Sequence, residues 1–180
     1  MGNSEKKLYE TTEFKGRIIE VKKSEVLLPN GKKANREVVY HPGAVAILAI
    51  NERQEVIFVK QYRLSVDQEL LEIPAGKIEQ NEQPIDCAKR ELMEETGYSS
   101  NDLRLIADVY VSPGITDERL YIYHAQNISE QTNQSLDSDE FVTLEYLTVE
   151  KIQEGLENLT FNDAKTVIAL QYYLNTLNDE

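Results

Sequence analysis

Apolar residues along most of this chain either alternate with polar ones or form short runs, as they do in the strands of a sheet. Residues 44–50 are apolar throughout, which is typical of a buried central strand. A polar turn at 51–54 separates them from the strand-like stretch 55–61, so we expect these two strands to form a hairpin. The other predicted strands lie within 8–28, with a break near Gly16, and over 36–40, 103–111, 120–126 and 141–147.

The clearest helix signal lies between Pro84 and Gly97. Proline suits the first helical position, because its missing N–H would be unpaired there, and glycine suits the left-handed residue that ends a helix. A helix of about 13 residues fits between them, and at 100° per residue Ile85, Ala88 and Leu92 share one stripe, which we take as its core face. Two further helices are predicted over 149–156 and 162–177.

Strands mixed with few helices predict an α/β fold with a mixed sheet. The first 40 or so residues read as a small antiparallel sheet, because turn signals such as Pro29-Asn30-Gly31 separate their strands. The break at His41-Pro42-Gly43 ends this pattern. We therefore expect an N-terminal β-sheet region over 1–42 and a main domain over 43–180.

Composition narrows the function classes. The 180 residues are 41% hydrophobic and 28% charged, which is ordinary for a globular chain, and the net charge of −13 argues against a nucleic-acid partner. No apolar run approaches the roughly 18 residues of a membrane span, and no secretion signal is visible at the N-terminus. One cysteine, Cys87, excludes an internal disulfide and fits a reducing cytoplasm. We expect a cytoplasmic protein with no membrane partner.

Five glutamates lie within 17 positions around the predicted helix: Glu79, Glu82, Glu91, Glu94 and Glu95. Glu91 and Glu95 lie one turn apart at the edge of the core stripe, where like charges destabilise a helix and carboxylates are costly to desolvate. A bound cation removes both costs. Carboxylate and carbonyl oxygens suit Mg²⁺ or Mn²⁺ rather than zinc. The other interpretation is a solvated acidic helix face.

The whole stretch decides between these interpretations. It reads Gly76, five residues, Glu82, seven residues, Arg90-Glu91-Leu92, one residue, Glu94-Glu95, one residue, Gly97-Tyr98. This resembles the complete signature of Nudix hydrolases. The resemblance implies an α/β/α sandwich with a mixed sheet, here preceded by the small N-terminal antiparallel sheet. It also implies metal-assisted attack of water on the phosphorus of a nucleoside diphosphate that is linked to another group.

Segments flanking the signature resemble the ADP-ribose pyrophosphatase branch of this family. They are Gln61-Tyr62-Arg63, residues 72–77, residues 112–118, the strand at 36–39 and the loop at 136–141; Pro113 lies 16 residues beyond Gly97. This implies hydrolysis of ADP-ribose to AMP and ribose 5-phosphate by a homodimer whose subunits exchange the N-terminal sheet. Two alternatives stay open: a Nudix hydrolase of another nucleotide, such as a nucleotide sugar or a dinucleoside polyphosphate, and an inactive domain that senses ADP-ribose. The complete set of metal positions argues against the sensor.

The resemblance also implies roles for individual residues. Mg²⁺, with Mn²⁺ as the alternative, would be bound by Glu91, Glu95 and the carbonyl of Ala75. Glu82 and Glu94 would hold further metals or metal-bound waters, and Arg90 would orient the carboxylates. The residues expected to hold adenine and the neighbouring phosphate are Ile18, Arg36, Glu37 and Arg63, and those expected to hold the terminal ribose are Gly114 and Glu118.

Several of these residues also have a plainer interpretation. Arg63 would otherwise be a surface charge that ends a strand, and Glu118 would pair with Arg119 or Lys165. In the exchanged dimer Arg36 and Glu37 would reach the partner's site, although a one-residue shift in the register of their strand is left open.

The base that takes the proton from water is expected outside the signature helix, because metal lowers the basicity of the glutamates that bind it. Residues 137–140 offer carboxylates on a loop that could close over bound substrate. The resemblance favours Glu140, with Asp139 and Glu82 as rivals. The two histidines, His41 and His124, are predicted to be structural.

Overall fold

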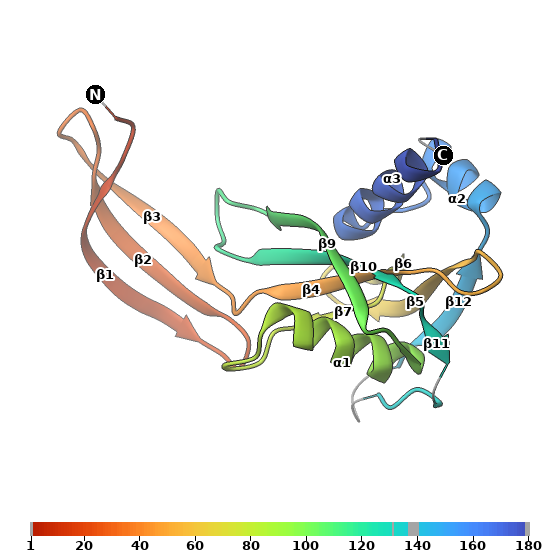
Figure 1. Cartoon of the computed structure of the whole chain (residues 1–180). Helices are drawn as coiled ribbons and strands as arrows, with labels where there is room; N and C mark the ends of the chain where they lie inside the picture. The colour runs from red at the N-terminus through yellow and green to blue at the C-terminus, as the bar shows by residue number, and fades with distance from the viewer. Residues whose placement is uncertain (1, 131, 137–140, 179–180) are drawn as a thin grey trace. The chain divides into compact units, whose positions relative to one another are not determined.

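The computed structural model describes residues 2–130, 132–136 and 141–178 (Figure 1). The chain forms two compact units. One consists of Met1–Gly43 and Val109–Arg119, and the other of Ala44–Asp108 and Leu120–Glu180. How the chain divides into functional domains stays a prediction.

The first unit is built on an antiparallel sheet in the order β1-β2-β3, formed by β1 (Lys6–Lys15), β2 (Glu20–Leu27) and β3 (Lys33–Tyr40). The predicted turn joins β2 to β3: the N–H of Gly31 donates to the carbonyl of Leu28 at 2.9 Å, and Gly31 has φ of 80°. At its far end β3 pairs with the segment around Thr116 in parallel, with the Val39 N–H donating to the Ile115 carbonyl at 2.8 Å. The loop after β9 is thereby joined to β3.

The second unit contains a mixed sheet in the order β7-β4-β10-β9. Its strands are β4 (Ala44–Ala49), β7 (Ala75–Lys77), β9 (Asp102–Tyr110) and β10 (Arg119–Gln126). The pair β4–β10 is parallel and β4–β7 is antiparallel. An antiparallel sheet β12-β5-β6 comprises β5 (Val56–Arg63), β6 (Gln68–Glu72) and β12 (Thr143–Leu147), and a short pair joins β8 (Tyr98–Ser99) to β11 (Ser129–Glu130).

The predicted hairpin of 44–50 with 55–61 is wrong. β4 and β5 enter different sheets, and only one isolated bridge, between Ile50 and Val56, links them in the described chain. The physical reason is that no edge is left for the pairing, because β4 is bonded to β7 and β10 on its two sides and β5 to β6 and β12. The turn itself is tight, since the side-chain oxygen of Asn51 accepts from the N–H groups of Arg53 and Glu55.

Helix α1 (Pro84–Thr96) has the predicted bounds, with Pro84 in its first turn and Gly97 at φ of 76° behind its last residue. The N–H of Gly97 donates to the Met93 carbonyl at 2.9 Å. Its predicted core face is wrong in one residue, because Ile85 is 40% exposed. The buried face of α1 is rotated about the helix axis relative to the predicted face. It carries Cys87, Ala88, Glu91, Leu92 and Glu95, so Ile85 lies at its margin in the first turn.

The mixed sheet lies between α1 and the C-terminal helices α2 (Val149–Glu157) and α3 (Ala164–Asn178), as Figure 1 shows. Successive side chains of β4 point to opposite faces of the mixed sheet. Val45, Ile47 and Ala49 belong to the buried cluster that includes Ala88 and Leu92 of α1. On the other face α3 packs against β4 and buries Ala169 and Leu170. This confirms the predicted α/β/α architecture with its N-terminal antiparallel sheet.

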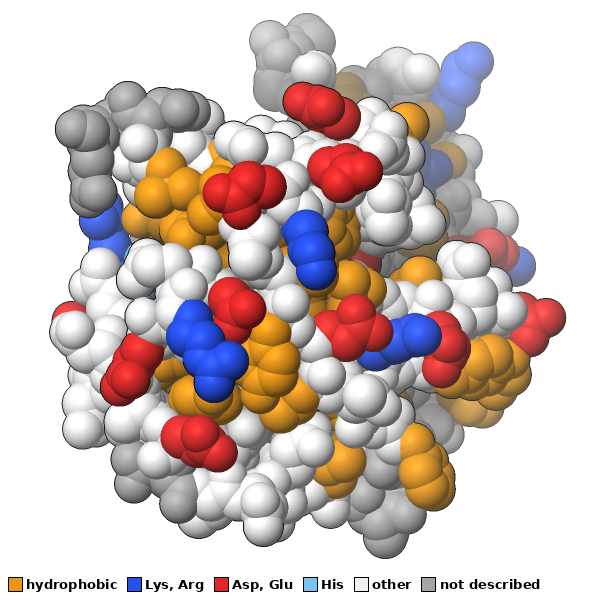
Figure 2. Space-filling model, turned by 90° about the vertical axis from the view of Figure 1, so that its right-hand side faces the viewer, with side chains coloured by type: hydrophobic (Ala, Val, Ile, Leu, Met, Phe, Trp, Pro, Cys, Tyr) orange, Lys and Arg blue, Asp and Glu red, His pale blue; other side chains and the backbone are white. Residues whose placement is uncertain are grey.

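The described surface carries charges of both signs. Acidic and basic side chains are interspersed with apolar ones over the face shown in Figure 2, rather than separated by sign. None of the helices in the described residues is long and apolar enough to cross a membrane.

Candidate active site

The predicted metal residues meet where α1 packs against β7. Gly76 of β7 lies against the carboxylate of Glu91: a Cβ at residue 76 would fall 1.8 Å from the Glu91 carboxyl carbon. Real Cβ atoms do not approach other atoms so closely, so a side chain at residue 76 would displace this carboxylate. The glycine that the signature requires therefore makes room for the glutamate one helix away.

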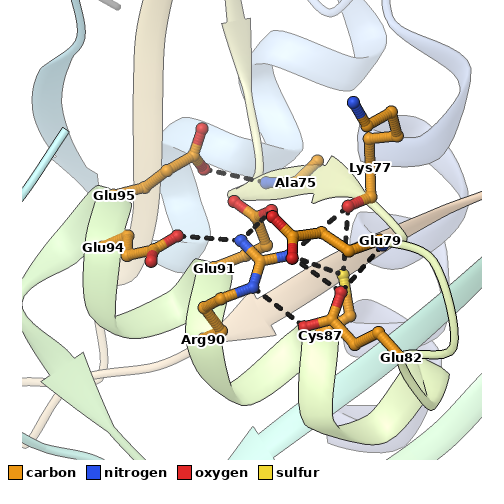
Figure 3. A network of polar contacts seen from close by, with 9 residues as sticks. All are labelled: Ala75, Lys77, Glu79, Glu82, Cys87, Arg90, Glu91, Glu94 and Glu95. Atoms are coloured by element: carbon orange, nitrogen blue, oxygen red, sulfur yellow. Dashed lines mark hydrogen bonds and ion pairs between the residues drawn. The ribbon is translucent and has the colours of Figure 1, made fainter. Parts of the chain in front are cut away.

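Arg90 lies among three carboxylates, as Figure 3 shows. Its Nη1 donates to Glu91 Oε1 at 2.7 Å and to Glu94 Oε2 at 2.8 Å, while its Nε and Nη2 donate to the two oxygens of Glu82 at 2.9 and 3.0 Å. One guanidinium thus fixes two glutamates of α1 and one from the loop before it. That Arg90 orients these carboxylates for a metal stays a prediction.

These charged hydrogen bonds change the acidity of the group. The hydrogen bonds from Arg90 lower the pKa of Glu82 to about 2 against an opposing effect of burial, and the N–H of Glu79 assists them. The same contact raises the pKa of Arg90 above its ordinary value. Glu82 therefore has little affinity for a proton, which makes it a weak candidate for the base.

Glu95 is the most deeply buried of the signature glutamates, at 3% exposure. Its Oε2 accepts the N–H of Ala75 at 2.9 Å, and the carbonyl of the preceding Pro74 accepts the N–H of Ile47 at 2.8 Å. The Pro74–Ala75 peptide, which immediately precedes the predicted carbonyl ligand, is thus held from α1 on one side and from β4 on the other.

The donor set at this place suits a hard divalent ion, because every candidate ligand atom is an oxygen. The buried Cys87 is no competing ligand, since burial raises the pKa of its thiol well above the usual range. Within the described residues, however, no group of three acidic, His or Cys side chains is already arranged to hold an ion. Glu91 and Glu94 face Arg90 instead, so ion binding would require their carboxylates to turn.

Arg63, predicted to bind substrate, is not an isolated surface charge. Its Nε and Nη2 donate to Glu72 Oε1 and Oε2, both at 2.7 Å, in a two-pronged pair. The hydrogen bonds that Arg63 donates to Glu72 raise the pKa of Arg63, and the charge of Glu95 adds to this. Arg63 therefore lies within electrostatic reach of Glu95.

The other predicted substrate residues lie in the first unit. Arg36 pairs with Glu5, Ile18 is 46% exposed, and Glu37 is exposed on β3. A Cβ on Gly114 would meet nothing within 4 Å, so the chain itself gives no packing reason for glycine there.

Glu118 lies near His41, with 3.8 Å between Oε1 and Nδ1. The ring Nδ1 of His41 accepts a hydrogen bond from the N–H of Gly43, and the backbone N–H of His41 donates to Asp117. These bonds are consistent with the structural role predicted for His41. Lys165, one alternative partner of Glu118, pairs with Glu72 and Asp163 instead. The predicted base Glu140 and its rival Asp139 lie outside the described residues.

Three charged residues behind Arg63 were not predicted as part of the site: Glu72, Asp163 and Lys165. A signal existed for Glu72, which stands in the segment 72–77 beside the signature. There was none for Asp163 and Lys165 at the start of α3, because Lys165 lies 93 positions from Glu72 in the chain.

Comparisons with known proteins show which family this chain belongs to. A family model described as NUDIX domain matches residues 39–170. The chain is 43% identical over 160 residues to an ADP-ribose pyrophosphatase of Bacillus subtilis, covering 88% of this chain and 86% of that protein. It is 42% identical, with the same coverage, to a protein of Bacillus methanolicus named methanol dehydrogenase activator. A crystal structure of an ADP compounds hydrolase superposes with a TM-score of 0.84 at 23% identity, over 97% of this chain and 95% of that one.

Proposed function

Because the chain belongs to the NUDIX domain family and is a Nudix hydrolase, we propose that its substrate is ADP-ribose, which it cleaves to AMP and ribose 5-phosphate. The observation that carries the proposal is the cluster of Glu82, Glu91 and Glu94 around Arg90, beside the glycine that makes room for Glu91. The 43% identity with a protein named ADP-ribose pyrophosphatase supports the substrate.

In this proposal Glu91, Glu95 and the Ala75 carbonyl would hold Mg²⁺, with Glu82 and Glu94 holding further metals or metal-bound waters. The ion would neutralise the diphosphate and make the attacking water more acidic. Without the ion, Arg90 gathers Glu82, Glu91 and Glu94 around one guanidinium and neutralises part of their charge.

In this proposal Arg63 offers Nη1 to the substrate, since this nitrogen has no hydrogen-bond partner among the described residues. With Ile18 and with Arg36 and Glu37 from the exchanged sheet of the other subunit, it holds the adenosine half. Arg36 must then exchange Glu5 for nucleotide. Gly114 and Glu118 hold the terminal ribose, where a carboxylate accepts from the sugar hydroxyls.

We assign the base to Glu140, because the depressed pKa of Glu82 leaves that rival with little tendency to take a proton. The variant Glu140→Gln should lower kcat by about 10²-fold and leave KM nearly unchanged. A large rise in KM with little change in kcat would give Glu140 a binding role and direct the search to Asp139.

The proposed enzyme is a cytoplasmic homodimer that exchanges the sheet β1-β2-β3. Leu8, Tyr9 and Phe14 of β1 are 42%, 65% and 55% exposed, and apolar surface of this kind on a regular strand favours a protein partner. Sedimentation equilibrium of the active protein should give the mass of two chains. A monomer with full activity would refute the exchange.

The test of the function is a hydrolysis panel of ADP-ribose, a nucleotide sugar and a dinucleoside polyphosphate, each with Mg²⁺ and with chelator. We expect the highest kcat/KM for ADP-ribose, AMP and ribose 5-phosphate as the only products, and no turnover with chelator. Preference for another substrate would support the alternative Nudix activity. Binding of ADP-ribose without turnover would support a sensor.

A further inference from the structure

Behind Arg63 lies a chain of charged side chains that the mechanism above does not use. Glu72, at the end of β6, is 1% exposed and accepts both hydrogen bonds of Arg63. Its Oε2 also accepts from Nζ of Lys165, in the first turn of α3. Lys165 in turn pairs with Asp163 at 3.0 Å. The order of charges is positive, negative, positive, negative, from the exposed end of β5 into the start of α3.

The start of α3 is itself firmly held. Asp163 caps the helix, since its Oδ2 accepts the N–H of Thr166 at 3.0 Å and the Thr166 hydroxyl at 2.6 Å. The Thr166 hydroxyl oxygen accepts the N–H of Ile73, the residue that follows Glu72, at 3.0 Å. Lys165 therefore projects from a helix end that is tied to the same segment that carries Glu72.

Lys165 affects Arg63 in two ways. Because Lys165 also pairs with Glu72, the negative charge of Glu72 is shared between two cations and neutralises Arg63 only in part. Lys165 also fixes the position of the carboxylate that sets the direction of the Arg63 guanidinium. Nε and Nη2 of the half-exposed Arg63 are then occupied by Glu72, while Nη1 has no hydrogen-bond partner among the described residues. A guanidinium held in this way needs no reordering when an anionic group arrives.

We propose that Lys165 is a positioning residue for substrate binding, which acts through Glu72 to aim Arg63 at the phosphate of the adenosine half. The proposal rests on the proposed function for the identity of the ligand. It goes beyond that function because it gives a role to α3, which supplies none of the predicted site residues.

The test compares Lys165→Met with Lys165→Arg, which keeps the positive charge, and with Lys151→Met, which removes an exposed lysine of α2. Lys165→Met should raise KM for ADP-ribose about tenfold, the size expected for one charged hydrogen bond, with kcat little changed. The dissociation constant of AMP, measured by calorimetry without metal, should rise in parallel. Lys165→Arg should restore most of both constants, and Lys151→Met should alter neither.

A second readout does not depend on catalysis. The Nε–H resonance of Arg63 in ¹⁵N NMR of the nucleotide-free protein should exchange slowly with water in the wild type and faster in Lys165→Met. An unchanged resonance together with an unchanged KM overturns the proposal, as does a loss of kcat at constant KM. If the wild type fails to hydrolyse ADP-ribose, the proposed function is wrong, whereas the Arg63 resonance still decides whether Lys165 positions it.

Should Lys165→Met not fold, the double variant Glu72→Gln/Lys165→Met removes one buried charge of each sign and leaves neither of these two residues charged. Arg63 then keeps its charge but loses its carboxylate partner, and KM for ADP-ribose should again rise about tenfold. Wild-type KM in a folded double variant would contradict the proposal.

Discussion

Two clusters of charged side chains lie in the second unit, and they differ in how their charges balance. Around Arg90, one positive charge meets three negative ones, from Glu82, Glu91 and Glu94. In the second cluster, Arg63 and Lys165 meet Glu72 and Asp163, so two positive charges face two negative ones.

The difference indicates what each cluster is for. The balanced cluster is largely buried, and its members satisfy one another without a ligand, as buried charges must. The Arg90 cluster has a surplus of negative charge at the edge of the helix core, and a divalent cation would remove it. The balanced cluster around Arg63 therefore supports the fold around the site, and the Arg90 cluster is the place where chemistry is expected.

The largest expected effect on activity follows from removing a proposed metal ligand of the Arg90 cluster. Glu91→Gln keeps the size of the side chain and removes its charge, so hydrolysis should fall by several orders of magnitude while the fold is retained. Steady-state kinetics in saturating Mg²⁺ and circular dichroism measure the two effects. Glu154→Gln, an exposed glutamate of α2, is the matched control. Near-normal turnover of Glu91→Gln would remove it from the catalytic ligands.

A smaller effect is expected when the same carboxylate is moved rather than removed. In Gly76→Ala the new methyl group would fall 1.8 Å from the Glu91 carboxyl carbon, and the flexible end of that side chain must turn away. A misplaced catalytic group costs about 10²-fold in rate, so kcat should fall by that order while thermal stability changes little. If kcat of Gly76→Ala equals that of the wild type, the close approach has no catalytic role.

The ion pair of Glu82 with Arg90 should make the stability of the protein depend on pH in the acid range. The pKa of Glu82 is about 2 in the folded protein and ordinarily 4.5, so its contribution to stability is present above pH 4.5 and is lost as the pH falls toward 2. Glu82→Gln should therefore flatten the fall in the free energy of unfolding over this window, as measured by urea denaturation at several pH values. Parallel pH profiles for the two proteins would show that the pair with Arg90 does not stabilise the fold.

The smallest expected effects contrast two hydroxyl groups on α3. The Thr166 hydroxyl is buried and makes two hydrogen bonds, so Thr166→Val should lower the free energy of unfolding by about 1–3 kcal/mol. The Tyr173 hydroxyl is buried without a partner among the described residues, so Tyr173→Phe should change it by less than about 0.5 kcal/mol or stabilise the protein. Urea unfolding measures both. A loss in Tyr173→Phe as large as that in Thr166→Val would reveal a partner for the phenol.

Local signals in the sequence predicted the features of the fold that depend only on residues close together in the chain. Pro84 and Gly97 set the ends of α1 because each acts on its own backbone. The resemblance to the family implied that Arg90 orients carboxylates, and its observed partners lie within one or two turns of the same helix or in its entry loop.

The parts that failed depend on residues distant in the chain. The hairpin of β4 with β5 looked favourable locally, but the edges of both strands are taken by strands from elsewhere. Ile85 obeys the helical period, yet the position of the sheet decides which row of α1 is buried. The pairing of Lys165 with Glu72 joins residues 93 positions apart, which no local pattern reveals.

The most direct test of the comparison is a titration of Mn²⁺, followed by electron paramagnetic resonance, into three proteins: wild type, Glu91→Gln and Lys165→Met. We predict that wild type and Lys165→Met bind Mn²⁺ with similar affinity, and that Glu91→Gln binds it at least about tenfold more weakly. Equal binding by wild type and Glu91→Gln, or loss of binding in Lys165→Met alone, would contradict the assignment of the metal site to the cluster around Arg90.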